Sequence, residues 1–217
     1  MLYTFTMKIT VFDTETTGIF PRGDKSPLLA NCPYIVQFSS IVYDTSTHSI
    51  VDSINDIIRL PESITIPDSA IAVHKITNEL MREVGTPLEL TLAGFNKQLE
   101  ETNVLLAHNL EFDAKMVECE FERCNEKSVM PNIPASKRYC TMKEGTNLCK
   151  IKTQYGYKWP KLEELHYHLF GTKLKHLHDA YHDIVICLRC YMFMNYQIDI
   201  AKKNEEIRQT IKNLECI

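Results

Sequence analysis

The chain has 217 residues, a length that fits one compact domain with a substantial buried core. Hydrophobic residues make up 44% of it and charged residues 24%, as in an ordinary globular protein, and the net charge of −4 gives no overall attraction to nucleic acid. No apolar run approaches the roughly 18–20 residues needed to cross a bilayer, so we expect no membrane partner.

The eight cysteines are scattered along a chain whose N-terminus lacks a basic stretch followed by an apolar run. We therefore expect reduced thiols and an intracellular, reducing compartment, either the cytoplasm or the nucleus. Cys187 and Cys190 form the only close pair. Because they lie in an apolar stretch, buried thiols are favoured there, and a zinc site is the alternative.

The first half of the chain predicts a sheet followed by helices. Alternating apolar residues indicate a strand at Met7–Asp13, and residues 1–6 are interpreted as an N-terminal extension. Two further β-rich runs, separated by a polar turn, complete an antiparallel meander at Tyr34–Tyr43 and Ile50–Leu60. Helices are expected at Asp68–Val73, Asn78–Val84 and Leu88–Glu101.

The second half alternates a short apolar strand, Val104–Ala107, with helical patterns. After a helix that follows this strand, further helices are expected at Lys161–Phe170 and Ala180–Gln197. The pattern therefore predicts one α/β domain over residues 7–198, a mixed sheet flanked by helices. Residues 199–217 are predicted to be a C-terminal helix or tail that could lie on the surface, contact a partner or fray.

Two carboxylates mark the end of the first strand. Asp13 and Glu15 are two residues apart, so their side chains point to the same side of the strand. Carboxylates in this position repel each other unless a cation lies between them, and their hard oxygen atoms suit Mg²⁺ or Mn²⁺. The alternative is a strand-end turn with two solvated acids.

Two later clusters combine histidines with acids. The first runs from His108 to Asp113 across a strand-to-helix junction, where open α/β sheets place their sites. The sequence does not choose between Glu111 and Asp113 there, and Asp113 could simply complement the helix dipole. The second cluster ends at Asp183 and leads into an apolar helix; it could equally be a polar helix entrance capped by Asp179.

A basic segment lies between Lys137 and Lys175, with nine basic residues against three acidic ones. Aromatic residues are interleaved with these charges at Tyr139, Tyr155, Tyr157 and Trp159. This mixture suits a surface that follows phosphates and stacks on bases. The alternative interpretation is a solvated loop with ordinary lysines.

Together the three clusters resemble, in order, the three motifs of the DEDDh (DnaQ-like) 3′→5′ exonucleases. The matching segments are Asp13-x-Glu15-Thr16-Thr17-Gly18, His108-Asn109-x-x-Phe112-Asp113 and His178-x-Ala180-x-x-Asp183. Two shorter segments, Val73-His74-Lys75-Ile76-Thr77 and Leu162-Glu163-Glu164-Leu165, also look like parts of this family. The resemblance covers about residues 7–195.

The resemblance implies a ribonuclease H-like fold and a site for two Mg²⁺ or Mn²⁺ ions. It assigns the metal-binding acids to Asp13, Glu15, Asp113 and Asp183, and the general base to His178 rather than His182. Backbone amides around Thr14 to Thr16 would meet the 3′ hydroxyl. The other implied substrate contacts are Val73, His74 and Phe112 at the terminal base, and His108 and Asn109 along the strand.

The implied activity is the release of nucleoside 5′-monophosphates from the 3′ ends of single-stranded nucleic acid, with DNA favoured over RNA. We expect a free-standing nuclease or a proofreading subunit with a polymerase or another protein partner. The oligomeric state is not predicted. A non-catalytic nucleic-acid-binding module of the same fold is the alternative. Gln37 stands where many family members carry an acid, and we expect it to affect sheet packing only.

Overall fold

The computed structural model describes residues 6–21, 29–175 and 178–215. Residues 1–5 of the predicted extension and residues 216–217 of the predicted C-terminal segment lie outside the described ranges. Within those ranges, no helix has the length and apolar character needed to span a membrane.

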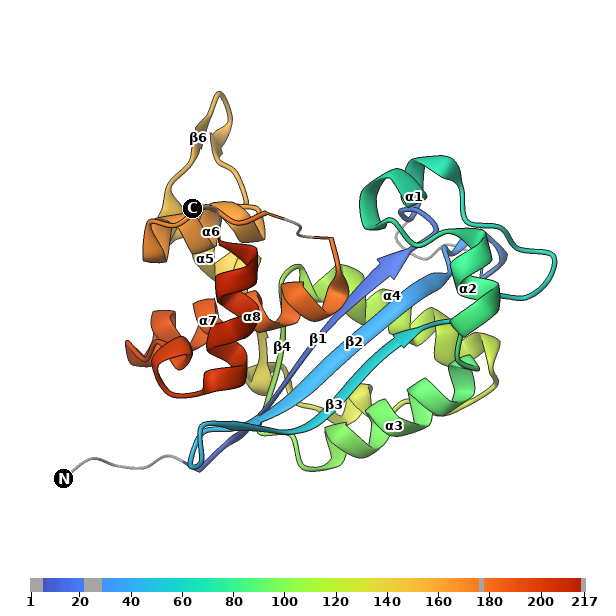
Figure 1. Ribbon diagram of the computed structural model, residues 1–217, viewed down its shortest axis with the longest axis horizontal. Coiled ribbons are helices and arrows are strands. Elements are labelled where there is room, and N and C mark those ends of the chain that lie inside the picture. Colours follow the sequence, from blue (N-terminus) through green and yellow to red (C-terminus); the bar gives the residue numbers. More distant parts are fainter. Residues whose placement is uncertain (1–5, 22–28, 176–177, 216–217) are drawn as a thin grey trace.

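A five-stranded mixed sheet forms the centre of the molecule (Figure 1). Its strand order is β3-β2-β1-β4-β5; β1, β2 and β3 form an antiparallel meander, whereas β4 and β5 run parallel to β1. The strands are β1 (Lys8–Thr16), β2 (Ile35–Asp44), β3 (Ser49–Ile57), β4 (Val104–Ala107) and β5 (Arg138–Cys140). This arrangement confirms the predicted mixed sheet and adds β5, which the sequence pattern did not predict.

Helices cover both faces of this sheet (Figure 1). The α-helices are α1 (Asp68–His74), α2 (Asn78–Val84), α3 (Leu88–Glu100), α4 (Leu110–Arg123), α5 (Thr141–Cys149), α6 (Leu162–Phe170), α7 (Ala180–Tyr196) and α8 (Glu205–Leu214). Short 3₁₀ helices lie at Leu29–Asn31, Met130–Asn132, Ala135–Lys137 and Ile200–Lys202. A small hairpin, β6 (Lys152–Thr153) and β7 (Gly156–Tyr157), stands apart from the main sheet.

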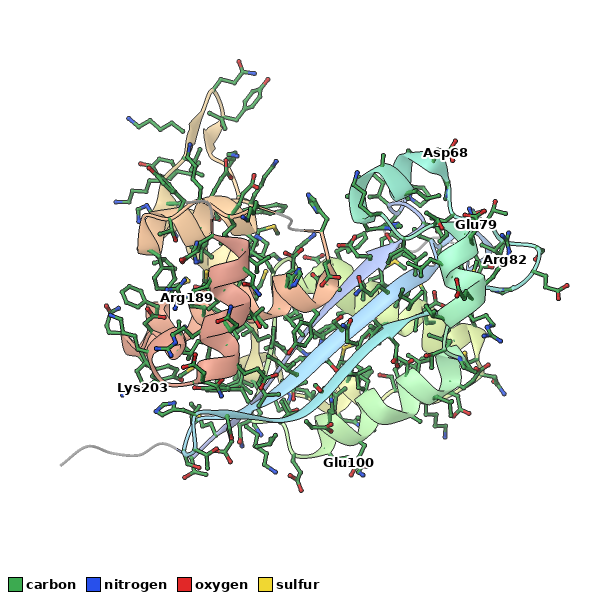
Figure 2. The ribbon with its side chains drawn as sticks, viewed as in Figure 1. Asp68, Glu79, Arg82, Glu100, Arg189 and Lys203 are labelled. Atoms are coloured by element: carbon green, nitrogen blue, oxygen red, sulfur yellow. The ribbon has the colours of Figure 1, made fainter. Side chains whose placement is uncertain are left out.

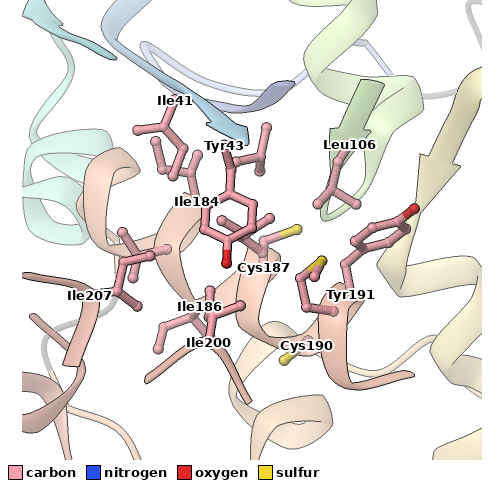
Figure 3. Packing of buried hydrophobic residues seen from close by; sticks show 14 of the residues in the cluster. Ile41, Tyr43, Leu106, Ile184, Ile186, Cys187, Cys190, Tyr191, Ile200 and Ile207 are labelled. Carbon is pink, nitrogen blue, oxygen red and sulfur yellow. The ribbon is translucent and has the colours of Figure 1, made fainter. Parts of the chain in front are cut away.

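The alternation along β1 divides the core into two layers. Ile9 and Val11 pack with α7, whereas Phe12 faces the opposite side, where its ring lies 5.1 Å from that of Phe95 on α3. Cys187 and Cys190 lie inside the first layer (Figure 3), both almost fully buried among apolar side chains. Cys187 and Cys190 are therefore buried thiols, and none of the cysteines in the described ranges forms a disulfide.

The C-terminal segment packs against the domain. Apolar residues on one side of α8 are buried against α7: Ile207, Ile211 and Leu214. Asn204 caps this helix, because its side chain accepts a hydrogen bond from the amide of Ile207. The described part of residues 199–217 thus contributes to the same core as α7.

Candidate active site

The three motif clusters meet at one pocket of about 530 Å³. Strand β1 brings residues from its C-terminal end, and helices α4 and α7 bring residues from their N-terminal ends. Such an edge of a mixed sheet gathers groups that are distant in sequence without disturbing the core beneath them. The predicted metal ligands and general base that line the pocket are Asp13, Glu15, Asp113, His178 and Asp183.

Within the pocket, Glu15, His178 and Asp183 form the tightest group. One donor atom from each lies within 4.8 Å of the others, and no other such group of three occurs among the described residues. The backbone amide of His178 donates to Oδ2 of Asp183 over 3.3 Å. The second oxygen, Oδ1, is buried and has no hydrogen-bond partner among the described residues.

Asp113 is the acid that the local sequence left undecided and that the family resemblance favoured over Glu111. It is buried, and its Oδ1 accepts a hydrogen bond from the Thr14 hydroxyl over 2.8 Å. Glu111 instead points into solvent and pairs with Lys143 over 2.7 Å. Of these two acids only Asp113 faces the pocket, and Thr14 contributes through its side chain, a role that the sequence did not indicate.

The carboxylates shift one another's ionisation. Burial raises the pKa of Asp13 well above its usual value, and the neighbouring carboxylates add to that shift. Burial likewise raises the pKa of Glu15 to about 8, with the charges of Asp183 and Asp113 adding to it. The pKa of Asp183 is also raised, first by burial. Full ionisation of this group at neutral pH is therefore unfavourable unless positive charge is supplied.

Divalent cations fit this donor set. Four carboxylates supply hard oxygen atoms, which Mg²⁺ and Mn²⁺ prefer, and a cation among them would convert mutual repulsion into attraction. The unpartnered Oδ1 of Asp183 is a buried acceptor of the kind that metal coordination satisfies. Asp13 and Asp113 line the same pocket outside the tight group. The carboxylates of the pocket therefore extend beyond the tight group.

The two candidate bases are separated by the structure. His178 lines the pocket and has a left-handed backbone conformation with φ 78°, which costs a non-glycine residue about 1–3 kcal/mol and recurs at functional sites. His182 does not line the pocket. Its amide donates to Asp179, the capping residue of α7, over 3.1 Å. Of the two histidines, only His178 lines the pocket, and its assignment as general base stays a prediction.

The predicted substrate contacts fall into two groups. Those that line the pocket are Thr14, His108, Asn109 and Phe112. Those that do not are Thr16, Val73 and His74, of which Val73 is 47% exposed on α1 and His74 is buried.

His108 uses both ring nitrogens internally, toward the Thr141 hydroxyl at 2.9 Å and the Pro160 carbonyl at 3.1 Å. Burial lowers the pKa of His108 to about 4, so this imidazole is neutral.

Other pocket residues were not predicted as site residues. Met142, Trp159, Pro160 and Lys161 also line the cavity. Trp159 and Lys161 belong to the basic and aromatic segment, so its composition carried the available signal. Met142 lies on α5, a helix that no sequence pattern indicated.

Gln37 has a larger role than expected. Its Oε1 accepts from the amide of Ala180 over 3.2 Å, and its Nε2 donates to Asp179 over 3.3 Å and to Asn55 over 3.0 Å. Gln37 thereby ties β2 to the start of the helix that carries Asp183. The expectation that it affects sheet packing only is therefore wrong.

Comparison with known proteins identifies the family of this chain. A family model described as Exonuclease, of the ribonuclease T type, matches residues 10–191, which is most of the chain. The chain belongs to this exonuclease family. This confirms the predicted DEDDh (DnaQ-like) family and, with it, the prediction that the chain is an exonuclease. A search of curated protein sequences finds no match.

Solved exonuclease structures share the fold. The zinc-bound complex of Escherichia coli exonuclease I with single-stranded DNA matches with a TM-score of 0.67 and 16% identity, over 88% of this chain and 41% of that one. Exonuclease I from Methylocaldum szegediense gives 0.64 and 16%, over 90% and 42%. A 3′-exonuclease that recognises the histone mRNA stem-loop gives 0.63 and 16%, over 91% and 66%.

These matches confirm the ribonuclease H-like fold. The chain spans less than half the length of the exonuclease I proteins that it matches.

Proposed function

We propose that this exonuclease domain removes nucleoside 5′-monophosphates from the 3′ ends of single-stranded DNA. One observation carries the proposal: four carboxylates and a histidine from three distant segments converge on one pocket in which the acids repel one another. Asp13, Glu15, Asp113 and Asp183 would hold two Mg²⁺ or Mn²⁺ ions. When bound, such a pair neutralises charge on the scissile phosphate and lowers the pKa of the attacking water.

The chain's own groups divide the remaining work. His178 accepts the proton of the attacking water, a task suited to a neutral imidazole near neutral pH. The contact between the His178 amide and Asp183 fixes the base next to a metal-binding acid. The Thr14 hydroxyl holds Asp113 in place, since a carboxylate that accepts a hydrogen bond loses rotational freedom. Phe112 and Trp159 offer aromatic surface at the pocket for a terminal base.

The preference for single-stranded DNA rests on the aromatic residues of the pocket and on the solved structures that share the fold. Stacking on Phe112 and Trp159 requires an unpaired base. Exonuclease I of Escherichia coli is solved with single-stranded DNA, and it has the same fold. Single-stranded RNA is the second candidate, because the 3′-exonuclease for histone mRNA matches almost equally well. A polymerase or other protein partner and a reducing intracellular compartment stay predictions.

The test is the degradation of matched 5′-labelled DNA and RNA oligonucleotides in Mg²⁺, Mn²⁺ or EDTA. We expect a ladder that shortens from the 3′ end with either ion and is absent in EDTA. The relative rates on the two substrates decide the sugar preference. Tight binding of both without any cleavage would contradict the proposal and favour a non-catalytic module.

A further inference from the structure

The hairpin β6–β7 projects from the body of the molecule beside α5 and α6 (Figure 1). All residues from Lys152 to Tyr157 are exposed. The hairpin is nevertheless ordered by its own contacts: the Thr153 hydroxyl donates to the Gly156 carbonyl over 2.9 Å, and the Lys158 amide donates to the Ile151 carbonyl over 3.0 Å. It is thus a preformed element that adds nothing to the hydrophobic core.

Aromatic side chains line this element on the solvent side. Tyr155 is 91% exposed, Trp159 60% and Tyr157 47%. Tyr139, by contrast, packs on Tyr191 with ring centroids 4.8 Å apart. The structure therefore divides these four aromatic residues: one packs against the core, whereas three are presented to solvent within five residues.

The charge around these rings is of one sign. Residues 150–161 contain four lysines and no acid. Lys158 pairs with Glu164 over 2.6 Å and Lys161 lies 3.5 Å from Glu163, so these two fix the base of the hairpin to α6. Lys150 and Lys152 form no ion pair with any described residue. They offer positive charge beside the exposed rings.

The same segment continues into the active-site pocket. Trp159 and Pro160 line the cavity, and the Pro160 carbonyl is bonded to His108 of the second motif. Extended chain rises about 3.3 Å per residue, so the four residues from Trp159 to Tyr155 reach about 13 Å outward at most. This reach corresponds to about four bases stacked at 3.4 Å.

We propose that the β6–β7 hairpin binds the unpaired bases that lie 5′ of the nucleotide being removed. The rings of Tyr155 and Tyr157 stack on bases while Lys150 and Lys152 neutralise phosphates, and Trp159 connects this track to the pocket. The occupant is a single-stranded nucleic acid, because stacking requires exposed base faces and the positive charge of the lysines favours a chain of phosphates. This inference rests on the proposed function and adds to it a binding surface outside the pocket.

The experiment separates binding at the hairpin from chemistry in the pocket. Cleavage is measured on a trinucleotide, which ends within the pocket region, and on a strand longer than the roughly 4–16 nucleotides that such surfaces cover. Binding of the long strand is measured separately by fluorescence anisotropy in EDTA. The variants are Tyr155→Ala combined with Tyr157→Ala, and Lys150→Ala combined with Lys152→Ala. Leu90→Ala, at a 65% exposed apolar residue on α3, is the matched control.

For the tyrosine variant we expect the ratio of kcat/KM on the long strand to that on the trinucleotide to fall about tenfold or more. The lysine variant should lower the slope of log affinity against log salt by about one for each lost phosphate contact. The control should change neither quantity. A ratio and a salt slope that stay at their wild-type values would overturn the inference.

Failure of the proposed function would look different. A wild-type chain that binds the long strand in EDTA through the hairpin, yet cleaves neither substrate with Mg²⁺ or Mn²⁺, would contradict the activity and keep the surface. A wild-type chain that cleaves both substrates, with a ratio insensitive to Tyr155 and Tyr157, would keep the activity and remove the surface.

Discussion

Two charged clusters occupy helix α7, and they are built in opposite ways. Near the start of the helix, Asp183 joins three other carboxylates, and burial first and neighbouring negative charges second raise the pKa values of Asp13, Glu15 and Asp183. Six residues later, Arg189 (Figure 2) is almost buried and satisfied: it makes two contacts with Asp199, at 2.9 and 3.1 Å, and one with Glu215 at 3.2 Å. The first cluster lacks positive charge, whereas in the second Arg189 supplies positive charge to its carboxylates.

The difference shows which cluster holds the fold together. Burial disfavours the ionised Asp199, but the hydrogen bond and charge of Arg189 more than offset it and hold the pKa of that carboxyl below its usual value. The arginine cluster thus stabilises the contact between α7 and the C-terminal segment. The acid cluster costs stability in the absence of cations, and a chain retains such a site for binding and chemistry. The variants below test this contrast.

The largest effect is expected for Asp13→Asn. The substitution keeps the side-chain volume but removes a metal-binding carboxylate, so we expect the rate of cleavage to fall by at least about 10³-fold. The melting temperature in EDTA should not fall, because the ionised Asp13 is unfavourable in the folded state. Steady-state cleavage and thermal unfolding measure the two quantities.

The matched control is Glu111→Gln, the same chemical change at an exposed acid that pairs with Lys143. It should leave the cleavage rate within a few-fold of wild type. Near-normal cleavage by Asp13→Asn would contradict the role of the acid cluster, and an unfolded variant would contradict its lack of stabilising value.

The next effect is expected for His178→Ala, which removes the proposed general base. We expect a loss of about 10²–10⁴-fold in the rate. His182→Ala is the comparison, because His182 is close in sequence but does not line the pocket, and it should stay within a few-fold of wild type. Single-turnover rates under saturating Mg²⁺ distinguish the two. If His182→Ala loses the larger factor, the base is assigned to the wrong histidine.

The acid cluster was within reach of sequence reasoning, whereas the arginine cluster was not. Asp13 and Glu15 could be identified from the sequence, because two carboxylates on one side of a strand end repel each other unless a cation lies between them. Asp113 needed the family pattern, since the local sequence offered Glu111 on equal terms. Arg189 gave no local signal, because its partners Asp199 and Glu215 lie in a segment whose packing depends on tertiary contacts.

The helices and strands also differ in how far the sequence predicted them. Long periodic segments such as α3 and α7 were predicted to within one residue at each end, because burial of an apolar face sets their pattern. The short strand β5, Arg138–Cys140, was missed because it has only three half-buried residues. The β6–β7 hairpin was missed because no residue in it is buried, so no apolar alternation marks it.

A third effect should be seen on stability rather than activity. Arg189→Met leaves the carboxylates of Asp199 and Glu215 without their partner, and breaking a buried ion pair in this way costs about 3–5 kcal/mol. Arg208→Met is the control: it removes an exposed pair with Glu205, for which at most about 1 kcal/mol is expected. Urea unfolding measures both. Equal losses for the two variants would mean that the arginine cluster does not anchor the C-terminal segment.

The smallest effect is expected at Gln37, which connects β2 to the start of the helix that carries Asp183. Gln37 is the cross-strand partner of Glu15, and its amide donates to Asp179 and Asn55. Gln37→Glu replaces this donor with another carboxylate, so we expect a loss of about 1–3 kcal/mol in the free energy of unfolding in EDTA. Mg²⁺ should reduce the loss, because a cation bound at Glu15 attracts the new charge.

Gln209→Glu, on the exposed side of α8, should show neither effect. The comparison with and without Mg²⁺ separates two causes. A loss of the same size in both conditions would assign the effect to the broken hydrogen bonds alone. A loss that Mg²⁺ reverses would show that the repulsion among the carboxylates of the acid cluster extends to β2. The neutral side chain of Gln37 would then limit the repulsion that bound cations must overcome. No loss in either condition would contradict the bridge from β2 to the start of α7.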